Sequence, residues 1–158
     1  MSRTLLAAVI DSSALICILR AEPAAPLFMA GFQNTGQLYI GAATRAETWL
    51  AAHNAKGKAG ARPIDALLQA LQVETVDFTE GSLAHYQHGA EHHHHKVDEK
   101  ASFKARLNMG DLFTYALVRE TGLPLFFQGT DFLNTKIPSA MEKLGYGVSL
   151  LGVPQPKD

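Results

Sequence analysis

The sequence predicts an α/β fold, with one domain built on a central, mostly parallel sheet of five strands flanked by helices. The first observation is alternation, since short apolar runs recur between segments with helical spacing of apolar residues. The second is the first run, Leu5–Ile10, which is almost continuously apolar, as in a strand buried on both faces of a parallel sheet. The third is the length of 158 residues, which suits one domain.

The five expected strands are short apolar runs bounded by polar residues, glycine or proline. The first ends where Asp11 follows Ile10. In chain order, strands are expected at residues 5–10, 37–40, 73–78, 125–127 and 148–151.

Helices are expected wherever a longer apolar pattern ends at a helix-stopping residue. The clearest is 111–121, because Gly122 and Pro124 follow it in the order that closes helices. The others are expected at residues 14–20, 24–32, 44–53, 64–71, 81–87 and 139–144. Residues 56–63 are expected to form a loop, and so is 91–104, which has no apolar period. Pro154 and Pro156 are expected to end the fold, so we predict a domain over 1–153 and a short C-terminal tail over 154–158.

Composition excludes several classes of protein. Apolar types make up 47% of the chain, which allows one sizeable core. The formal net charge of −1 leaves no broad positive field, so any nucleic acid must bind locally. The single cysteine, Cys17, cannot form an intrachain disulfide, which favours a reducing, cytoplasmic location. The apolar stretch 4–19 is interrupted at Asp11 and is shorter than the ~20 residues of a membrane span, so we expect no membrane segment.

Acidic residues follow the predicted strands or begin the predicted helices at one edge of the sheet. Asp11 follows the first strand, Glu47 lies in the first turn after the second, and Asp131 follows the fourth. Asp111 begins the helix that leads into the fourth strand. In open α/β sheets, ligands bind at the carboxyl ends of the strands, so these side chains are candidates for one site.

Each acid also has a structural explanation. Asp11 and Asp111 can be helix N-caps, Glu47 can form a capping box with Thr44, and Asp131 can be a turn residue. Four carboxylates in one crevice would nevertheless repel one another, and a hard divalent cation relieves that repulsion. Such an ion, Mg²⁺ or Mn²⁺, keeps water molecules that can attack a phosphate. The combination therefore favours hydrolysis of a phosphodiester.

Four segments of the sequence resemble the PIN domain and, within it, the VapC toxins of toxin–antitoxin pairs. They are 11–15 (Asp-Ser-Ser-Ala-Leu), 43–47 (Ala-Thr-Arg-Ala-Glu), 107–117 (Leu-Asn-Met-Gly-Asp-Leu-Phe-Thr-Tyr-Ala-Leu) and 125–132 (Leu-Phe-Phe-Gln-Gly-Thr-Asp-Phe). The last two, in this order and spacing, are the specific ones. The resemblance covers almost the whole chain.

The resemblance implies a metal-dependent ribonuclease with a five-stranded parallel sheet. Asp11 and Asp111 would be the main metal ligands, Glu47 and Asp131 would complete the acidic pocket, and Ser13 would support the metal shell. It also implies an RNA substrate, a small cognate antitoxin and a homodimer.

The sequence departs from the family pattern at three places, the first of which is Gly41, where Ser is common in the family. Thr135-Lys136 stands where family members often carry Thr-Asp, and the stretch between Tyr86 and Arg106 is longer than usual. That stretch holds four histidines, His92–His95, which we interpret as a solvated loop in preference to a metal site. The basic residues are too scattered to predict a phosphate-binding patch; they are Arg45, Lys56, Lys58, Arg62, Lys104 and Arg106.

Two other functions remain open from the residues alone. The first is a phosphatase with an aspartyl nucleophile at Asp11, but that class usually has a second aspartate at the position of Ser13. The second is a binding module that keeps the fold without the chemistry. The presence of an acid at all four places favours the nuclease.

Overall fold

The computed structural model describes residues 3–93 and 107–157, and its centre is a four-stranded parallel sheet in the order β3-β2-β1-β4. The strands are β1 (Leu5–Ile10), β2 (Thr35–Gly41), β3 (Glu74–Val76) and β4 (Leu125–Phe126). Val9 of β1 pairs with both Tyr39 of β2 and Leu125 of β4, so β1 lies in the middle of the sheet. The predicted α/β class with a parallel sheet is confirmed.

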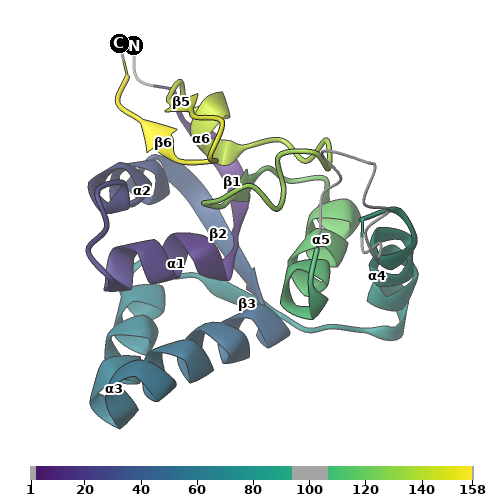
Figure 1. The fold of residues 1–158 in the computed structure, drawn as a ribbon, viewed down its shortest axis with the longest axis horizontal. Helices are drawn as coiled ribbons and strands as arrows, with labels where there is room; N and C mark the ends of the chain where they lie inside the picture. Colours follow the sequence, from purple (N-terminus) through teal and green to yellow (C-terminus); the bar gives the residue numbers. More distant parts are fainter. Residues whose placement is uncertain (1–2, 94–106, 158) are drawn as a thin grey trace.

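Helices cover both faces of this sheet (Figure 1). One core contains Ala8, Ile10 and side chains of α1 (Ser12–Leu19), α2 (Ala25–Gln33), α3 (Ala42–Ala70) and α6 (Ala140–Lys143). The second core contains Val9 and side chains of α5 (Met109–Thr121). The helix α4 (Glu80–His93) packs on the outer side of α5. Among the described residues, no helix combines the length and apolar character needed to cross a bilayer.

The prediction of a fifth parallel strand at 148–151 is wrong. Gly147–Val148 (β5) pairs antiparallel with Pro154–Gln155 (β6) in a separate ribbon. The chain turns between them because Ser149 Oγ accepts hydrogen bonds from the backbone N–H groups of Leu151 and Val153, and Gly152 has a φ of +71°. Residues 138–139 also occupy the outer edge of β4, where a fifth strand would pair.

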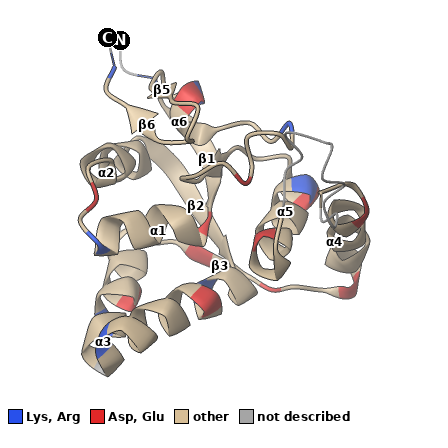
Figure 2. Cartoon of the chain, viewed as in Figure 1, with Lys and Arg blue, Asp and Glu red and all other residues tan. Residues whose placement is uncertain are grey.

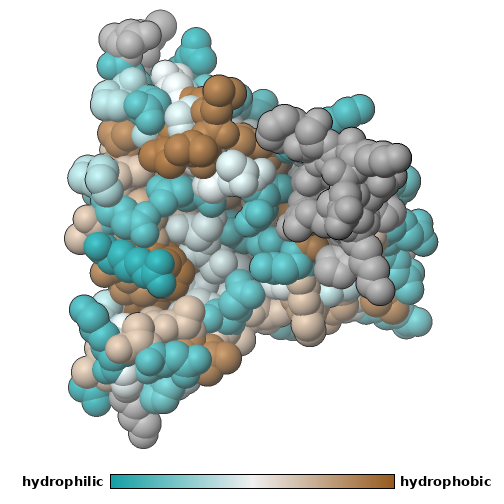
Figure 3. Space-filling model, in the orientation of Figure 1, coloured by the Kyte–Doolittle hydropathy of each residue, from teal (hydrophilic) through white to brown (hydrophobic). Residues whose placement is uncertain are grey.

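The ribbon places hydrophobic surface at one end of the molecule. Leu150 and Leu151, in the turn between β5 and β6, are 94% and 71% exposed. Figure 3 shows hydrophobic side chains gathered over the end that carries this ribbon. Pro154, the first residue of the predicted tail, is buried in β6.

The predicted loop over 56–63 is reduced to a kink. Helix α3 continues through this segment except at Lys56 and Gly57, whose backbone angles are not helical. Gly57 has a φ of +68°, a conformation that glycine adopts without strain. The helix resumes after the kink and contains Pro63.

The prediction that residue 91 begins a loop is also wrong, because α4 extends to His93. The reason is close packing on α5: a Cβ on Gly89 would stand 2.6 Å from Tyr115 Cδ1, and Tyr86 and Ala90 join the same core. Helix α4 therefore includes His92 and His93. The remainder of the predicted loop, with His94 and His95, lies outside the described residues.

Candidate active site

The four predicted acids lie where the carboxyl ends of β1 and β4 meet the first turns of α3 and α5. Asp11 directly follows β1, and Asp131 lies in the turn region after β4. Glu47 lies near the start of α3 and Asp111 near the start of α5. Figure 2 shows ribbon segments coloured for acidic residues near the junction of these elements. The fold thus gathers residues that are 120 positions apart in the sequence.

Asp11 is the most buried of the four acids, with 3% of its surface exposed to solvent. It is the N-cap of α1, and its Oδ2 accepts hydrogen bonds from Ser13 N at 3.0 Å and Ser13 Oγ at 2.6 Å. Its Oδ1 accepts one from Thr114 Oγ1 at 2.8 Å. A carboxylate oxygen accepts about two bonds, so the three bonds fix the side chain and leave room for one further partner on Oδ1.

Two threonines that we did not predict as site residues extend this network. Thr114 Oγ1 lies 3.1 Å from Thr44 Oγ1, and both residues are 1% exposed. Thr114 therefore links α5 directly to Asp11, and Thr44 links α3 to Asp11 through Thr114. The signal for Thr114 was its position three residues after Asp111, which places both on one face of a helix.

Ser13 connects Asp11 to the strand on its other side. While its hydroxyl donates to Asp11 Oδ2, Ser13 Oγ accepts a hydrogen bond from the backbone N–H of Gln128 at 2.9 Å. Gln128 comes just after β4, so Ser13 joins the ends of β1 and β4. Ser13 stands where aspartyl phosphatases usually carry a second aspartate, and its hydroxyl donates to Asp11 Oδ2 and cannot serve as that class's second carboxylate.

Asp111 lies in the first turn of α5 and is not its N-cap. The N-cap is Asn108, whose side chain accepts from Asp111 N at 2.9 Å while Asp111 Oδ2 accepts from Asn108 N at 3.0 Å. This is a capping box, and it holds the carboxylate near the helix N-terminus, where the helix dipole favours negative charge.

The structural explanation for Glu47, a capping box with Thr44, is wrong. Gly41 is the N-cap of α3, and the hydroxyl of Thr44 faces Thr114. The Glu47 carboxylate instead lies over Gly110, where any Cβ would overlap with its Oε2 atom. Gly110 therefore allows the carboxylate of Glu47 to approach the first turn of α5.

The pKa shifts of Asp111 and Asp131 show that the four carboxylates lie near one another. The pKa of Asp111 is raised from 3.8 to about 7: burial is the largest cause, the hydrogen bond from Asn108 N opposes it, and the negative charges of Asp11, Asp131 and Glu47 add to the rise. Burial and the charge of Asp11 also raise the pKa of Asp131. An acid with such neighbours is stabilised in its charged form by a cation.

The four acidic side chains do not form a complete set of metal ligands as they stand. Among the described residues, no three His, Cys, Asp or Glu side chains stand close enough to hold a metal ion as they are. Like charges repel one another, and hydrogen bonds hold Asp11 at the N-terminus of α1 and Asp111 in the capping box of α5.

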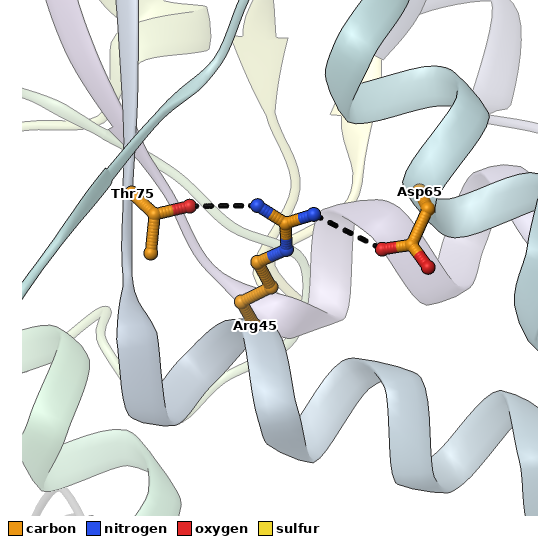
Figure 4. Close-up of polar contacts among 3 residues, drawn as sticks. All are labelled: Arg45, Asp65 and Thr75. Atoms are coloured by element: carbon orange, nitrogen blue, oxygen red, sulfur yellow. Dashed lines mark hydrogen bonds and ion pairs between the residues drawn. The ribbon is translucent and has the colours of Figure 1, made fainter.

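Other residues weighed in the sequence lie elsewhere. Arg45 does not face the acids, since it donates to Thr75 Oγ1 at 2.9 Å and forms an ion pair with Asp65 at 3.1 Å (Figure 4). His92 and His93 lie on α4, with ring contacts to His88 and Tyr115. They are therefore not part of the acidic site.

The fold and the four acids are consistent with the family that a sequence comparison identifies. The family model described as "PIN domain" matches residues 8–138 of the chain, and the protein belongs to the PIN-domain family. The match runs from β1 through the segment after β4 and so includes all four acids.

Within that family, the chain is similar to VapC ribonucleases. It is 33% identical over 133 residues to VapC ribonuclease Mb0640 of Mycobacterium bovis, covering 82% of this chain and 95% of that protein. It is 30% identical over 139 residues to Ribonuclease VapC42 of Mycobacterium tuberculosis, covering 84% and 98%.

Solved structures show the same fold. VapC20 of Mycobacterium tuberculosis, a Sarcin-Ricin loop cleaving toxin, aligns with a TM-score of 0.64 at 16% identity and covers 82% of this chain and 95% of that chain. VapBC2 of Rickettsia felis, bound to a DNA fragment from its promoter, aligns with a TM-score of 0.62 at 13% identity and covers 85% and 96%.

The raised pKa of Asp111 predicts how the free energy of unfolding of the metal-free protein varies with pH. The carboxyl ionises near 3.8 in the unfolded chain and near 7 in the folded one, so the folded state binds the proton more tightly. This tighter proton binding stabilises the folded state fully below pH 4, and the stabilisation is lost as the pH rises through 7. Asp111→Asn keeps an oxygen for Asn108 N and removes the charge. We expect the variant to be more stable than the parent by about 1 kcal/mol at pH 8 in chelator, and equal to it at pH 4.

Urea unfolding of both proteins at the two pH values measures this difference. Equal or lower stability of Asp111→Asn at pH 8 would show that the carboxylate is not under repulsion in the metal-free fold.

Proposed function

We propose that the protein is a metal-dependent endoribonuclease toxin that hydrolyses RNA phosphodiester bonds and is held inactive by a cognate antitoxin. The observation that carries this proposal is the convergence of Asp11, Glu47, Asp111 and Asp131 at one end of a PIN-domain sheet. Similarity to proteins named as VapC ribonucleases supports RNA as the substrate.

The donor set fits a divalent cation. Asp11 and Asp111 would hold Mg²⁺, or Mn²⁺, since both ions prefer oxygen ligands. When bound, such an ion stabilises negative charge on a phosphate and makes water more acidic. The open acceptor position on Asp11 Oδ1 and the raised pKa of Asp111 both support this assignment.

The other steps of the reaction depend on side chains of the protein. Ser13 and Thr114 hold Asp11 in one orientation. Glu47 or Asp131, both exposed, orients the attacking water and accepts its proton. The water oxygen bonds to phosphorus, the bond from phosphorus to the 3′-oxygen breaks, and that oxygen takes up a proton. The products are a 5′-phosphate and a 3′-hydroxyl.

We further propose a protein partner, a homodimer and a cytoplasmic setting, where RNA is available. Two similar structures, at 16–17% identity, are a toxin–antitoxin complex from Klebsiella pneumoniae and VapBC-1 from nontypeable Haemophilus influenzae. An antitoxin would place an arginine or lysine against the acids. Trp49 and Leu50 are exposed on α3 and would offer apolar contacts to the second copy.

Asp11→Asn tests the proposed chemistry. The amide can keep its oxygen toward Ser13 and turn its nitrogen toward Thr114, whose hydroxyl can then donate to Thr44. We expect a melting temperature close to that of the parent and at least ~100-fold slower cleavage of RNA. Chelator should abolish parental cleavage, and Mg²⁺ or Mn²⁺ should restore it. Parental activity in Asp11→Asn, cleavage in excess chelator, or a 2′,3′-cyclic phosphate end would contradict the mechanism.

Glu47→Gln separates catalysis from packing over Gly110. The amide has nearly the same shape but does not accept a proton. We expect a fall of at least ~100-fold in the rate of cleavage, with unchanged unfolding free energy. Glu74→Gln is the matched control, because Glu74 is exposed on β3. If Glu47→Gln and this control retain the same activity, Glu47 has no role in the reaction and the proton acceptor is another group.

A further inference from the structure

A concave surface lies beside the C-terminal half of α5, whose N-terminal end carries Asp111. It is a cleft of about 590 Å³ between α4, the C-terminal half of α5 and the segment 134–138. Arg119, Lys136 and three histidines line it; the histidines are His88, His92 and His93. Among the described residues that line the cleft, none is an aspartate or glutamate. The net charge of −1 counts histidine as neutral, so the positive charge of the cleft comes from Arg119 and Lys136.

The two permanent charges of the cleft are not used to hold the fold together. In the described part of the chain, the one ion pair joins Arg45 and Asp65, so neither Arg119 nor Lys136 has a carboxylate partner there. Arg119 lies over the ring of Tyr115, with its Cζ atom 5.8 Å from the ring centroid. It also donates to the Tyr115 hydroxyl at 3.5 Å. This contact orients the guanidinium without neutralising it.

Lys136 is held in an unusual backbone conformation. Its φ is +62°, in the left-handed region that side chains other than glycine, asparagine and aspartate rarely adopt. The neighbouring Thr135 is buried, and its hydroxyl donates to Phe132 O at 2.6 Å, which fixes this turn. Lys136 itself is exposed. The turn therefore presents an exposed cation at the edge of the cleft at a cost in backbone strain.

The cleft and the acidic site share two supporting elements. Helix α5 carries Asp111 in its first turn and Arg119 in its last turns, and the segment after β4 carries Asp131 and then Lys136. Arg119 lies eight positions after Asp111 in the helix, which corresponds to ~12 Å along the axis. At ~3.4 Å per phosphate, that distance spans three to four nucleotides of a stacked strand.

We propose that this cleft binds phosphate groups of the same RNA strand that is cut at the acids, three to four nucleotides from the broken bond. The inference rests on the proposed function. The acids repel a polyanion, and the chain as a whole offers no positive field, so a strand needs a local cationic contact to remain near the site. Arg119 and Lys136 supply that contact, with the histidines of α4 as further donors to phosphate oxygens.

The test uses a fluorescent 12-nucleotide single-stranded oligoadenosine, whose bases stack, with binding measured by anisotropy over a range of salt concentrations. All proteins carry Asp11→Asn, so that the probe is not cut. The variant is Arg119→Gln with Lys136→Gln. The matched control is Arg62→Gln with Lys143→Gln, which removes the same charge from exposed positions on α3 and α6.

We expect the cleft variant to bind the probe at least ~10-fold more weakly than the control at low salt. Its plot of log affinity against log salt should be shallower by about 1.4, since each lost phosphate contact on a single strand removes about 0.7. Lys136→Gln alone, at a residue with no hydrogen bond or ion pair in the described structure, should lower the slope by about 0.7. This single variant keeps the test valid if Arg119→Gln weakens the packing of Tyr115.

Equal affinity and equal slope for the cleft variant and the control would overturn the proposal. So would unchanged RNA binding together with lost binding of a co-purified protein partner, because the cleft would then be a protein-docking surface. The assay does not depend on cleavage. If the parent cuts no RNA with metal but the cleft variant still loses RNA binding, the proposed catalysis fails and the binding site stands.

Discussion

The hydrogen bonds around the buried carboxylate of Asp11 hold the active end of the molecule together. Ser13 binds one oxygen and also accepts from the backbone after β4, while Thr114 binds the other oxygen and contacts Thr44 on α3. Four elements that are far apart in the sequence are thereby fixed around one charged group. A buried carboxylate is costly unless it is hydrogen-bonded, so the fold stabilises this charge with three donors.

The remaining acids follow from that arrangement. Because Thr114 donates a hydrogen bond to Asp11, the N-terminal part of α5 lies beside the end of β1. Asp111, three residues before Thr114, is therefore placed near Asp11. Gly110 then leaves the space that the carboxylate of Glu47 occupies. Helix N-termini at α1 and α5 ease part of the repulsion, since both present partial positive charge to the acids. The rest of the repulsion is what a divalent cation would relieve.

Much of this could be predicted from the sequence, because strand-end acids and apolar runs are local signals. The positions of β1, β4 and α5 and the convergence of the acids depend on such signals. The fifth strand could not be excluded in the same way. Its apolar run is interrupted by a turn that depends on Ser149 Oγ and Gly152, and its place beside β4 is taken by residues 138–139.

Other errors came from contacts between distant segments. The capping box of Glu47 failed because Thr44 bonds a threonine 70 positions away. Helix α4 continues to His93 because Gly89 lets it approach Tyr115, and no pattern within residues 80–93 reveals that neighbour. The importance of Thr114 likewise depends on a partner 103 positions earlier, Asp11. Side-chain hydrogen bonds across the fold therefore mark the limit of what local patterns predict.

Calorimetric titration of the metal-free protein with Mn²⁺ tests the central claim most directly, namely that the network around Asp11 gathers the acids into a cation site. The account predicts saturable binding of one ion per chain. It also predicts weaker binding at pH 6 than at pH 8, because Asp111, with a pKa of about 7, is protonated at the lower pH and competes with the ion. Absence of saturable binding, or equal affinity at the two pH values, would contradict it.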